Sequence, residues 1–248
     1  MTAASTPQST AHPRPAGGGA PDVRQLVSFS FYRLDPEWRR LPERTRKDQA
    51  GEFLSIVEPY RTRLMTLSYS LIGLKANVDF MLWSVGAQLE AVQELSVAVL
   101  KTGLGAYLTT PHRYLSMTRR SVYVDKLDPG HPEQRRFITP AKSKYLFVYP
   151  FVKTDAWYQL PFAERQAMMD EHIVVGNKYP SVKIHTTYSF GLDDPDFVLA
   201  FEGDEPKDFL DLVLELREAK ARPYTKLDTP IFTCVAKPLR AILDDLGG

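Results

Sequence analysis

Three side chains in the second half of the chain have the types and spacing for chemistry at a metal cofactor: Tyr149, Lys153 and His172. A neutral imidazole is the commonest metal ligand in proteins. Lys153 follows Tyr149 by four residues, so on an extended strand both side chains point to the same face. The sequence therefore predicts a metal-cofactor site that a strand and a following helix build together.

The strand is expected over residues 145–153, an apolar and aromatic run, and the helix is expected after Pro161, which needs no N–H in a first turn. Residues spaced by three and four lie on one face of a helix, and we expect this face to point inward and to include His172. Its members are Phe162, Gln166, Met169, His172 and Ile173. The alternative for His172 is a core histidine that a backbone carbonyl satisfies.

The motifs YPFVK, WYQLP, ER..MM.EH and a Thr/Tyr-rich strand ending in GLDD follow one another between Tyr145 and Asp194. In this order and spacing they resemble the second half of the chlorite dismutase family. Within that family the chain looks most like the branch that makes haem by decarboxylating coproheme. The resemblance extends from Asp22 to Lys237 and is sharpest after Ser143.

The resemblance implies that His172 is the proximal ligand of the porphyrin iron, and that iron coproporphyrin III is both cofactor and substrate. It further implies that hydrogen peroxide is the co-substrate and that haem b forms through a three-propionate intermediate. Tyr149 would be oxidised to a radical that attacks the first propionate, and Lys153 would hold the acidic group beside it. The alternative for Tyr149 is a core tyrosine whose hydroxyl is satisfied.

A bound porphyrin needs an apolar slot and a rim of cations and hydroxyls. The slot residues that we expect are Phe147, Met168, Met169, Val175 and Phe190. Candidate partners for the four propionates, besides Lys153, are Arg135, Arg136, Arg222, Tyr114, Ser116 and Thr229. Each arginine could instead be a solvated surface charge.

The sequence departs from the dismutases at the strand after the histidine helix, where they carry an arginine above the iron. Alignment on GLDD puts that position at Ile184, and counting from His172 puts it at His185. Adjacent strand residues point to opposite faces, so only one of them can face the metal. We favour Ile184, which makes His185 a structural residue.

Two other features of the family bear on reactivity. His131 lies where actinobacterial decarboxylases carry a distal histidine that deprotonates peroxide, although it could be an exposed loop residue; His112 is a weaker candidate. At the position of the carboxylate that strengthens the axial histidine in dismutases, this chain has Lys220 or Ala221, with Glu218 as an alternative. The rival functions are a chlorite dismutase and a non-enzymatic haem-binding protein.

Composition limits the other possibilities. With 44% hydrophobic and 25% charged residues, the chain has the profile of an ordinary globular protein, and a net charge of +1 argues against a nucleic-acid or membrane-surface partner. No apolar run approaches the roughly 20 residues that span a bilayer, and no signal peptide is recognisable. Cys234 is the single cysteine, which excludes an intrachain disulfide. We expect a cytoplasmic protein.

The order of expected elements predicts an α+β fold. Two ferredoxin-like modules would face one another as a dimeric α+β barrel within one chain. We expect a disordered tail over residues 1–21, a first module over 22–104, a connector over 105–143 and a haem-binding module over 144–248. Family analogy adds a homo-oligomer, commonly a pentamer, and a transient contact with ferrochelatase.

Overall fold

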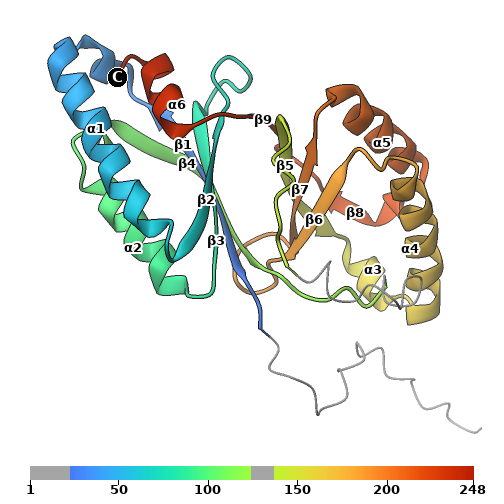
Figure 1. The fold of residues 1–248 in the computed structure, drawn as a ribbon. Coiled ribbons are helices and arrows are strands. Elements are labelled where there is room, and N and C mark those ends of the chain that lie inside the picture. Colours follow the sequence, from blue (N-terminus) through green and yellow to red (C-terminus); the bar gives the residue numbers. More distant parts are fainter. Residues whose placement is uncertain (1–22, 124–136) are drawn as a thin grey trace, which may run out of the picture.

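The computed structural model of the chain describes residues 23–123 and 137–248 (Figure 1). The tail expected over residues 1–21 lies outside these ranges. The same is true of three predicted site residues: His131, Arg135 and Arg136.

The first half of the chain forms four strands and two long helices. Its elements are β1 (Leu26–Leu34), the 3-10 helix η1 (Pro36–Arg40), α1 (Glu43–Tyr60), β2 (Leu64–Ser70), β3 (Phe80–Gly86), α2 (Leu89–Leu100), the 3-10 helix η2 (Gly105–Tyr107) and β4 (Leu108–Met117). This order is β-α-β-β-α-β, the pattern of a ferredoxin-like module. β4 completes the pattern, although the sequence assigned its residues to a connector.

The short helix η1 and the long helix α1 are separate elements. Asp35 does cap the first turn, because its Oδ1 accepts a hydrogen bond of 2.9 Å from the Glu37 amide. The chain then becomes extended at Leu41, as the residue before a proline usually is, and α1 begins after Pro42. Pro59 lies in the last turn of α1 and does not precede its end.

The second half repeats the module and adds short elements. They are β5 (Tyr145–Lys153), α3 (Asp155–Gln159), α4 (Phe162–Asn177), β6 (Lys183–Tyr188), β7 (Phe197–Gly203), α5 (Pro206–Glu218), the 3-10 helix η4 (Arg222–Tyr224), β8 (Thr225–Leu227), β9 (Phe232–Ala236) and α6 (Leu239–Leu246). The expected strand, helix, strand and strand around His172 are therefore present. The C-terminal helix α6 returns to the first half and lies beside α1 (Figure 1).

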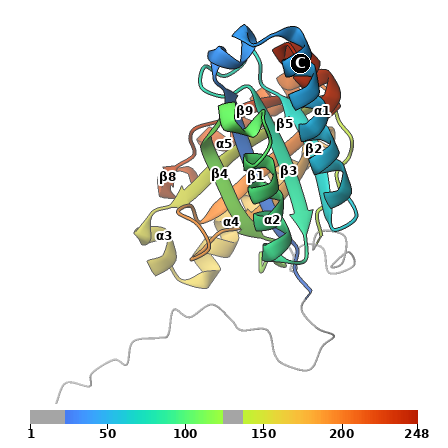
Figure 2. The ribbon, with the colours of Figure 1, turned by 90° about the vertical axis from the view of Figure 1, so that its left-hand side faces the viewer.

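The strands of the described residues form one nine-stranded sheet in the order β7-β6-β4-β1-β3-β2-β9-β5-β8, and β5 also pairs with β7. The β5–β7 ladder runs from Tyr145 opposite Gly203 to Phe151 opposite Phe197, so the sheet closes on itself. α1, α2 and α6 cover one outer side of the closed sheet, and α3, α4 and α5 cover the other (Figures 1 and 2). The predicted α+β class is confirmed.

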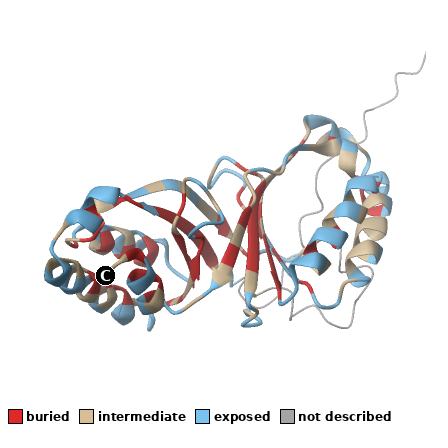
Figure 3. Cartoon of the chain, turned by 90° about the horizontal axis from the view of Figure 1, so that it is seen from above, coloured by how far each residue is buried: buried red, intermediate tan, exposed pale blue. Residues whose placement is uncertain are grey.

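Three apolar clusters hold this arrangement together. One joins α1, α2 and α6 to the first strands, a second fills the interior of the closed sheet, and a third joins β5 and β7 to α5 and the end of α4. Figure 3 shows the buried residues concentrated in the central strands. In β1, Val27 and Phe29 pack inside the sheet while Tyr32 and Leu34 pack under the helices. Both faces of β1 are covered.

Candidate functional site

His172 lies on α4, which begins directly after Pro161 as the sequence predicts. Burial is the main cause that lowers the pKa of its imidazole to about 4, and the Lys153 ammonium lowers it further. Neither ring nitrogen has a hydrogen-bond partner among residues 23–123 and 137–248. The imidazole is therefore neutral at physiological pH, which is the state that binds a metal.

The strand β5 presents alternate residues to the helices. Phe147 and Tyr149 pack in the cluster against α5, whereas Leu146 and Val148 point into the closed sheet. Tyr149 is 7% exposed and stacks on Phe201 with ring centroids 5.6 Å apart. Burial raises the pKa of its phenol far above the ordinary value, and the Asp228 carboxylate raises it further. Tyr149 therefore keeps its proton at any physiological pH.

Lys153 ends the same strand and is also buried. Burial lowers the pKa of its ammonium to about 8, and the nearby Arg222 guanidinium contributes to this shift. The Nζ atom lies 4.3 Å from the centre of the Trp157 ring and donates a long hydrogen bond of 3.4 Å to the Ala221 carbonyl. Because Lys153 also lowers the pKa of His172, the two side chains lie in one electrostatic environment.

Arg222 belongs to a three-residue charge cluster at the same end of the second half. Asp228 Oδ2 accepts from Arg222 Nη1 at 2.6 Å and from Arg217 Nη1 at 2.8 Å. Both guanidinium groups oppose the rise in the pKa of Tyr149 that burial causes, so their charges lie close to the phenol. One carboxylate against two guanidinium groups leaves a net positive charge beside Tyr149 and Lys153.

The two alternatives on β6 point to opposite faces. Ile184 pairs with Phe201, which faces the helices, and His185 pairs with Ala200, which lies inside the closed sheet. A Cβ at Gly176, one turn after His172, would lie 3.8 Å from Ile184 Cδ1, so Ile184 reaches α4. His185 is buried and its Nε2 lies 2.6 Å from Glu202 Oε1. The residue that shares a face with Tyr149 is therefore Ile184.

Several predicted site residues are not brought to this cluster. Tyr114 packs against Phe31 and Phe232 inside the closed sheet, and Ser116, also inside, donates a 2.8 Å hydrogen bond to Thr187 Oγ1. Both residues have even numbers, and the even-numbered side chains of β4 point into the closed sheet. His112 lies at the same interior, 3.0 Å from Asn77 Nδ2.

Other expected residues lie at the margins. Thr229 is exposed, and Phe190 is 48% exposed among aromatic neighbours. Met168 and Met169 are half-buried on α4. Near the end of α5, the Lys220 amide donates to Glu171, and the Ala221 carbonyl accepts from Lys153. Among the residues that the structure describes, no carboxylate hydrogen-bonds to His172, and Glu218 has no such contact.

Sequence reasoning missed four residues near the site: Trp157, Arg165, Arg217 and Asp228. Arg165 precedes His172 by seven residues, so helical spacing alone could have placed both on one face. Trp157 could have been found from the WYQLP motif that directly follows the strand of Tyr149. Nothing in the sequence indicates that Arg217 and Asp228 meet, because the contact depends on the path of the chain after α5.

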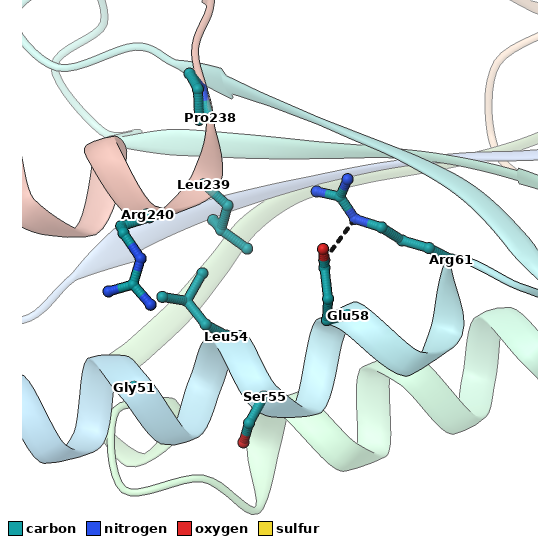
Figure 4. Close-up of a pocket in the computed structure, with 8 residues that line it drawn as sticks. All are labelled: Gly51, Leu54, Ser55, Glu58, Arg61, Pro238, Leu239 and Arg240. Atoms are coloured by element: carbon teal, nitrogen blue, oxygen red, sulfur yellow. Dashed lines mark ion pairs between the residues drawn. The ribbon is translucent and has the colours of Figure 1, made fainter.

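A groove of about 420 Å³ lies between α1 and α6, away from His172 (Figure 4). Leu54 and Leu239 line it together with the exposed pair Glu58 and Arg61, whose Oε2 and Nε atoms are 2.7 Å apart. None of its lining residues belongs to the predicted site, so the groove is separate from the cluster around Tyr149. In the described parts of the chain, no helix is long and apolar enough to cross a membrane.

The cluster on β5, α4 and η4 combines a neutral imidazole, aromatic walls, a protonated phenol and several cations. Imidazole can ligate iron, aromatic and aliphatic walls suit a flat apolar ring, and cations suit carboxylates on its edge. The residues present therefore fit an iron porphyrin that carries acidic side chains. The same set suits a divalent metal alone poorly, because the described residues hold no group of three metal-binding side chains.

Comparison with known proteins agrees with this fit. A family model described as Chlorite dismutase matches residues 46–237. Coproheme decarboxylase of Mycolicibacterium smegmatis (strain ATCC 700084 / mc(2)155) is 31% identical over 195 residues, which cover 75% of this chain and 78% of that protein. Coproheme decarboxylase of Staphylococcus carnosus (strain TM300) is 27% identical over 204 residues, 75% of this chain and 81% of that protein. A solved variant of chlorite dismutase from Candidatus Nitrospira defluvii superimposes with a TM-score of 0.82 at 27% identity, over 90% of this chain and 95% of that one.

Proposed function

This chain belongs to the chlorite dismutase family, and on that basis we propose that it catalyses the hydrogen peroxide-dependent decarboxylation of coproheme to haem b. The observation that carries the proposal is the pairing of a buried phenol, Tyr149, with a buried ammonium, Lys153, on the strand face next to a neutral imidazole, His172. Two relatives named coproheme decarboxylase support the same choice.

His172 would hold the iron of the porphyrin. Burial and the Lys153 ammonium keep its imidazole unprotonated, so no proton has to leave before the nitrogen can coordinate. No carboxylate among the described residues hydrogen-bonds to the ring, so the imidazole would donate less electron density than a carboxylate-paired histidine. A ligand that is also the substrate and must leave as product would suit this weaker bond.

Tyr149 would act on the propionate, and Lys153 would hold its carboxylate. When bound, the iron porphyrin with hydrogen peroxide supplies the oxidising power of the reaction. The phenol keeps its proton because burial and Asp228 raise its pKa, so Tyr149 begins the reaction as a neutral hydrogen-atom donor and returns to that state. The Lys153 ammonium is charged at neutral pH, and an arriving carboxylate would raise its pKa back toward the ordinary value.

The proposed reaction balances for each propionic acid group. The side chain loses carbon dioxide and two hydrogen atoms to leave a vinyl group, and one hydrogen peroxide is reduced to two waters. Two such steps convert coproheme to haem b. Chlorite dismutation is less well supported, because Ile184 offers no cation or hydrogen-bond donor on the strand face that looks toward α4.

The test is to load the purified full-length protein with coproheme, add hydrogen peroxide in small portions and follow the pigment by mass spectrometry. Stepwise loss of two carboxyl groups, with haem b as the end product, supports the decarboxylase. Oxygen release from chlorite with unchanged coproheme would instead make the protein a dismutase. Unchanged pigment in both assays would make it a binding protein.

The family analogy also leads us to propose a homo-oligomer, with a pentamer as the specific expectation, and a transient contact with ferrochelatase, the enzyme that would deliver the iron porphyrin. Light scattering coupled to size-exclusion chromatography tests the first point. A monomer at micromolar concentration would contradict it.

A further inference from the structure

Buried polar atoms without partners gather at the corner where β5, α3 and α4 meet. In the described part of the chain, five buried side-chain nitrogen or oxygen atoms lack a hydrogen-bond partner. Four of them belong to Thr154, Arg165 and Gln166, and two of those four are Nε and Nη1 of Arg165. Such atoms are rare in proteins because each forgoes the hydrogen bonds that water would give it. Their concentration at one corner therefore calls for a specific explanation.

Arg165 is the most unusual of these residues because it is charged and only 1% exposed. Its guanidinium carbon lies 5.9 Å from the centre of the Phe162 ring, and its charge opposes the rise in the pKa of Tyr123 that burial causes. No carboxylate among residues 23–123 and 137–248 forms an ion pair with it. A buried charge without a counter-charge destabilises the folded state.

Two carboxylates in this part of the protein have other partners. Asp170, one turn further along α4, accepts a 2.6 Å hydrogen bond from Gln166 Nε2. Asp196 accepts from the Tyr158 hydroxyl and from the Lys153 amide, each at 2.7 Å. Among residues 23–123 and 137–248, no carboxylate therefore forms an ion pair with Arg165.

The position of Arg165 connects it to the site around His172. Seven residues separate the two on α4, so they share a helix face about 10 Å apart along the axis. Arg165 and Trp157 both lie close enough to Tyr123 to oppose the rise in its pKa that burial causes, and the Trp157 ring lies under the Lys153 ammonium. Arg165 thus lies one aromatic residue beyond the lysine, at a distance from the imidazole that the edge substituents of a porphyrin reach.

We propose that Arg165 binds a carboxylate on the edge of the tetrapyrrole, with Nε and Nη1, which have no hydrogen-bond partner among the described residues, as the donors. This proposal rests on the proposed function for the identity of the ligand. It assigns one of the four propionates of coproheme to a residue on the histidine helix itself. The Arg165 charge then destabilises the free protein and is compensated only in the complex.

The proposal gives Arg165 opposite effects on stability and on binding. Arg165→Met removes the uncompensated charge and keeps a long unbranched side chain, so the ligand-free variant should melt at a temperature equal to or above that of the wild type. The same variant should lose the charge-assisted hydrogen bonds to the ligand, which weakens binding by about tenfold to a hundredfold. A residue with a purely structural role would lower the melting temperature when replaced.

The experiment uses the full-length protein and iron-free coproporphyrin III, so that no turnover is involved. Binding is titrated by porphyrin fluorescence for the wild type, Arg165→Met and Arg165→Lys, and each titration is repeated with the tetramethyl ester, which lacks the carboxylates. The matched control is Arg44→Met, since the Arg44 side chain is 94% exposed. We expect Arg165→Met alone to lose affinity for the acid, no variant to lose affinity for the ester, and Arg165→Lys to recover part of the loss.

Equal affinity of the wild type and Arg165→Met for coproporphyrin III would overturn the proposal. An equal loss for acid and ester together with a lower melting temperature would also overturn it, because that pattern describes a packing role. A wild-type protein that binds the tetracarboxylate tightly but never releases carbon dioxide from its iron complex would refute the decarboxylase and leave the Arg165 site standing. The two proposals can therefore fail separately.

Discussion

Replacing Lys153 with methionine should stabilise the ligand-free protein, although it removes a residue on which the proposed chemistry depends. Lys153 is buried, and its ammonium makes a 3.4 Å contact to a carbonyl and lies over the rings of Trp157 and Phe151, while the Asp196 carboxylate opposes the fall in its pKa only in part. Its pKa falls from 10.5 to about 8 because burial and Arg222 disfavour the charged form. Methionine has a similar length and no charge, so it removes that penalty.

The pKa shift gives the size of the effect. The fall of the Lys153 pKa from 10.5 to about 8 means that the buried charge lowers the free energy of unfolding of the wild type by about 3 kcal/mol at pH 7, where the lysine is charged in both the folded and the unfolded state. Loss of the contact with the Trp157 ring offsets about 1 kcal/mol. The net expectation is that Lys153→Met unfolds with a free energy about 2 kcal/mol higher than that of the wild type at pH 7.

The pH dependence of this difference identifies its cause. Because the folded-state pKa of Lys153 is lowered, the wild type regains stability as pH rises from about 8 to 10.5, where the lysine is neutral in both states. Urea unfolding of the wild type and Lys153→Met at several pH values across this range should show the advantage of the variant vanish. Lys101→Met, at an exposed position at the end of α2, is the control and should track the wild type throughout. A difference that does not change with pH, or a variant less stable than the wild type at pH 7, would refute the reasoning.

Three further predictions concern the same site. Tyr149→Phe should bind coproheme but not decarboxylate it, because the ring stacked on Phe201 remains while the oxidisable hydroxyl is lost; product analysis by chromatography checks this, and a near-normal rate would remove Tyr149 from the chemistry. His172→Gln should lose the spectrum of a histidine-ligated iron and should also lose a pH dependence of stability. The wild type should lose about 3 kcal/mol of its free energy of unfolding as pH falls from 6.5 to 4, because folding lowers the pKa of His172 to about 4. A variant that loses stability equally steeply in acid would contradict this. Phe147→Ala should destabilise the protein by about 3–5 kcal/mol in urea unfolding, because Phe147 stacks on Phe209 at 4.1 Å in the cluster under α5, and a loss below 1 kcal/mol would show that the cluster is not a core.

The sequence predicts the elements that carry the site because their patterns are local. Spacing by three and four predicts α4 and places His172 on its inward face. Alternation along a strand predicts that Tyr149 and Lys153, four residues apart on β5, point to the same face. For Ile184 and His185, strand alternation predicts that only one of the two side chains faces the histidine helix, but not which one. The register of β6 against β7 then decides between them, and that register depends on residues far along the chain.

The features that the sequence did not predict depend on long-range contacts. β4 reads as a polar connector because its pattern alternates weakly, and it becomes a strand by pairing with β1 and, at Met117, with β6. Tyr114 and Ser116 were expected at the porphyrin rim, but the register with β1 turns both into the closed sheet. The pairing of Arg217 with Asp228 across η4 has no local signature either.

On the proposed function, the charges around His172 would favour a polyanionic ring over a dicarboxylate or a bare metal. Lys153 and Arg165 are both buried and form no ion pair with a described carboxylate, and Arg222 shares Asp228 with Arg217. The charges of Lys153 and Arg222 repel each other in a region from which water is largely excluded, as the lowered pKa values of Lys153 and His172 indicate. A ligand with several carboxylates removes this repulsion at more than one point at once, while a ligand with fewer leaves part of it in place. Loss of carboxylates during the proposed reaction would therefore weaken the hold of the protein on its own product, which gives the site a physical means of releasing haem b while retaining coproheme.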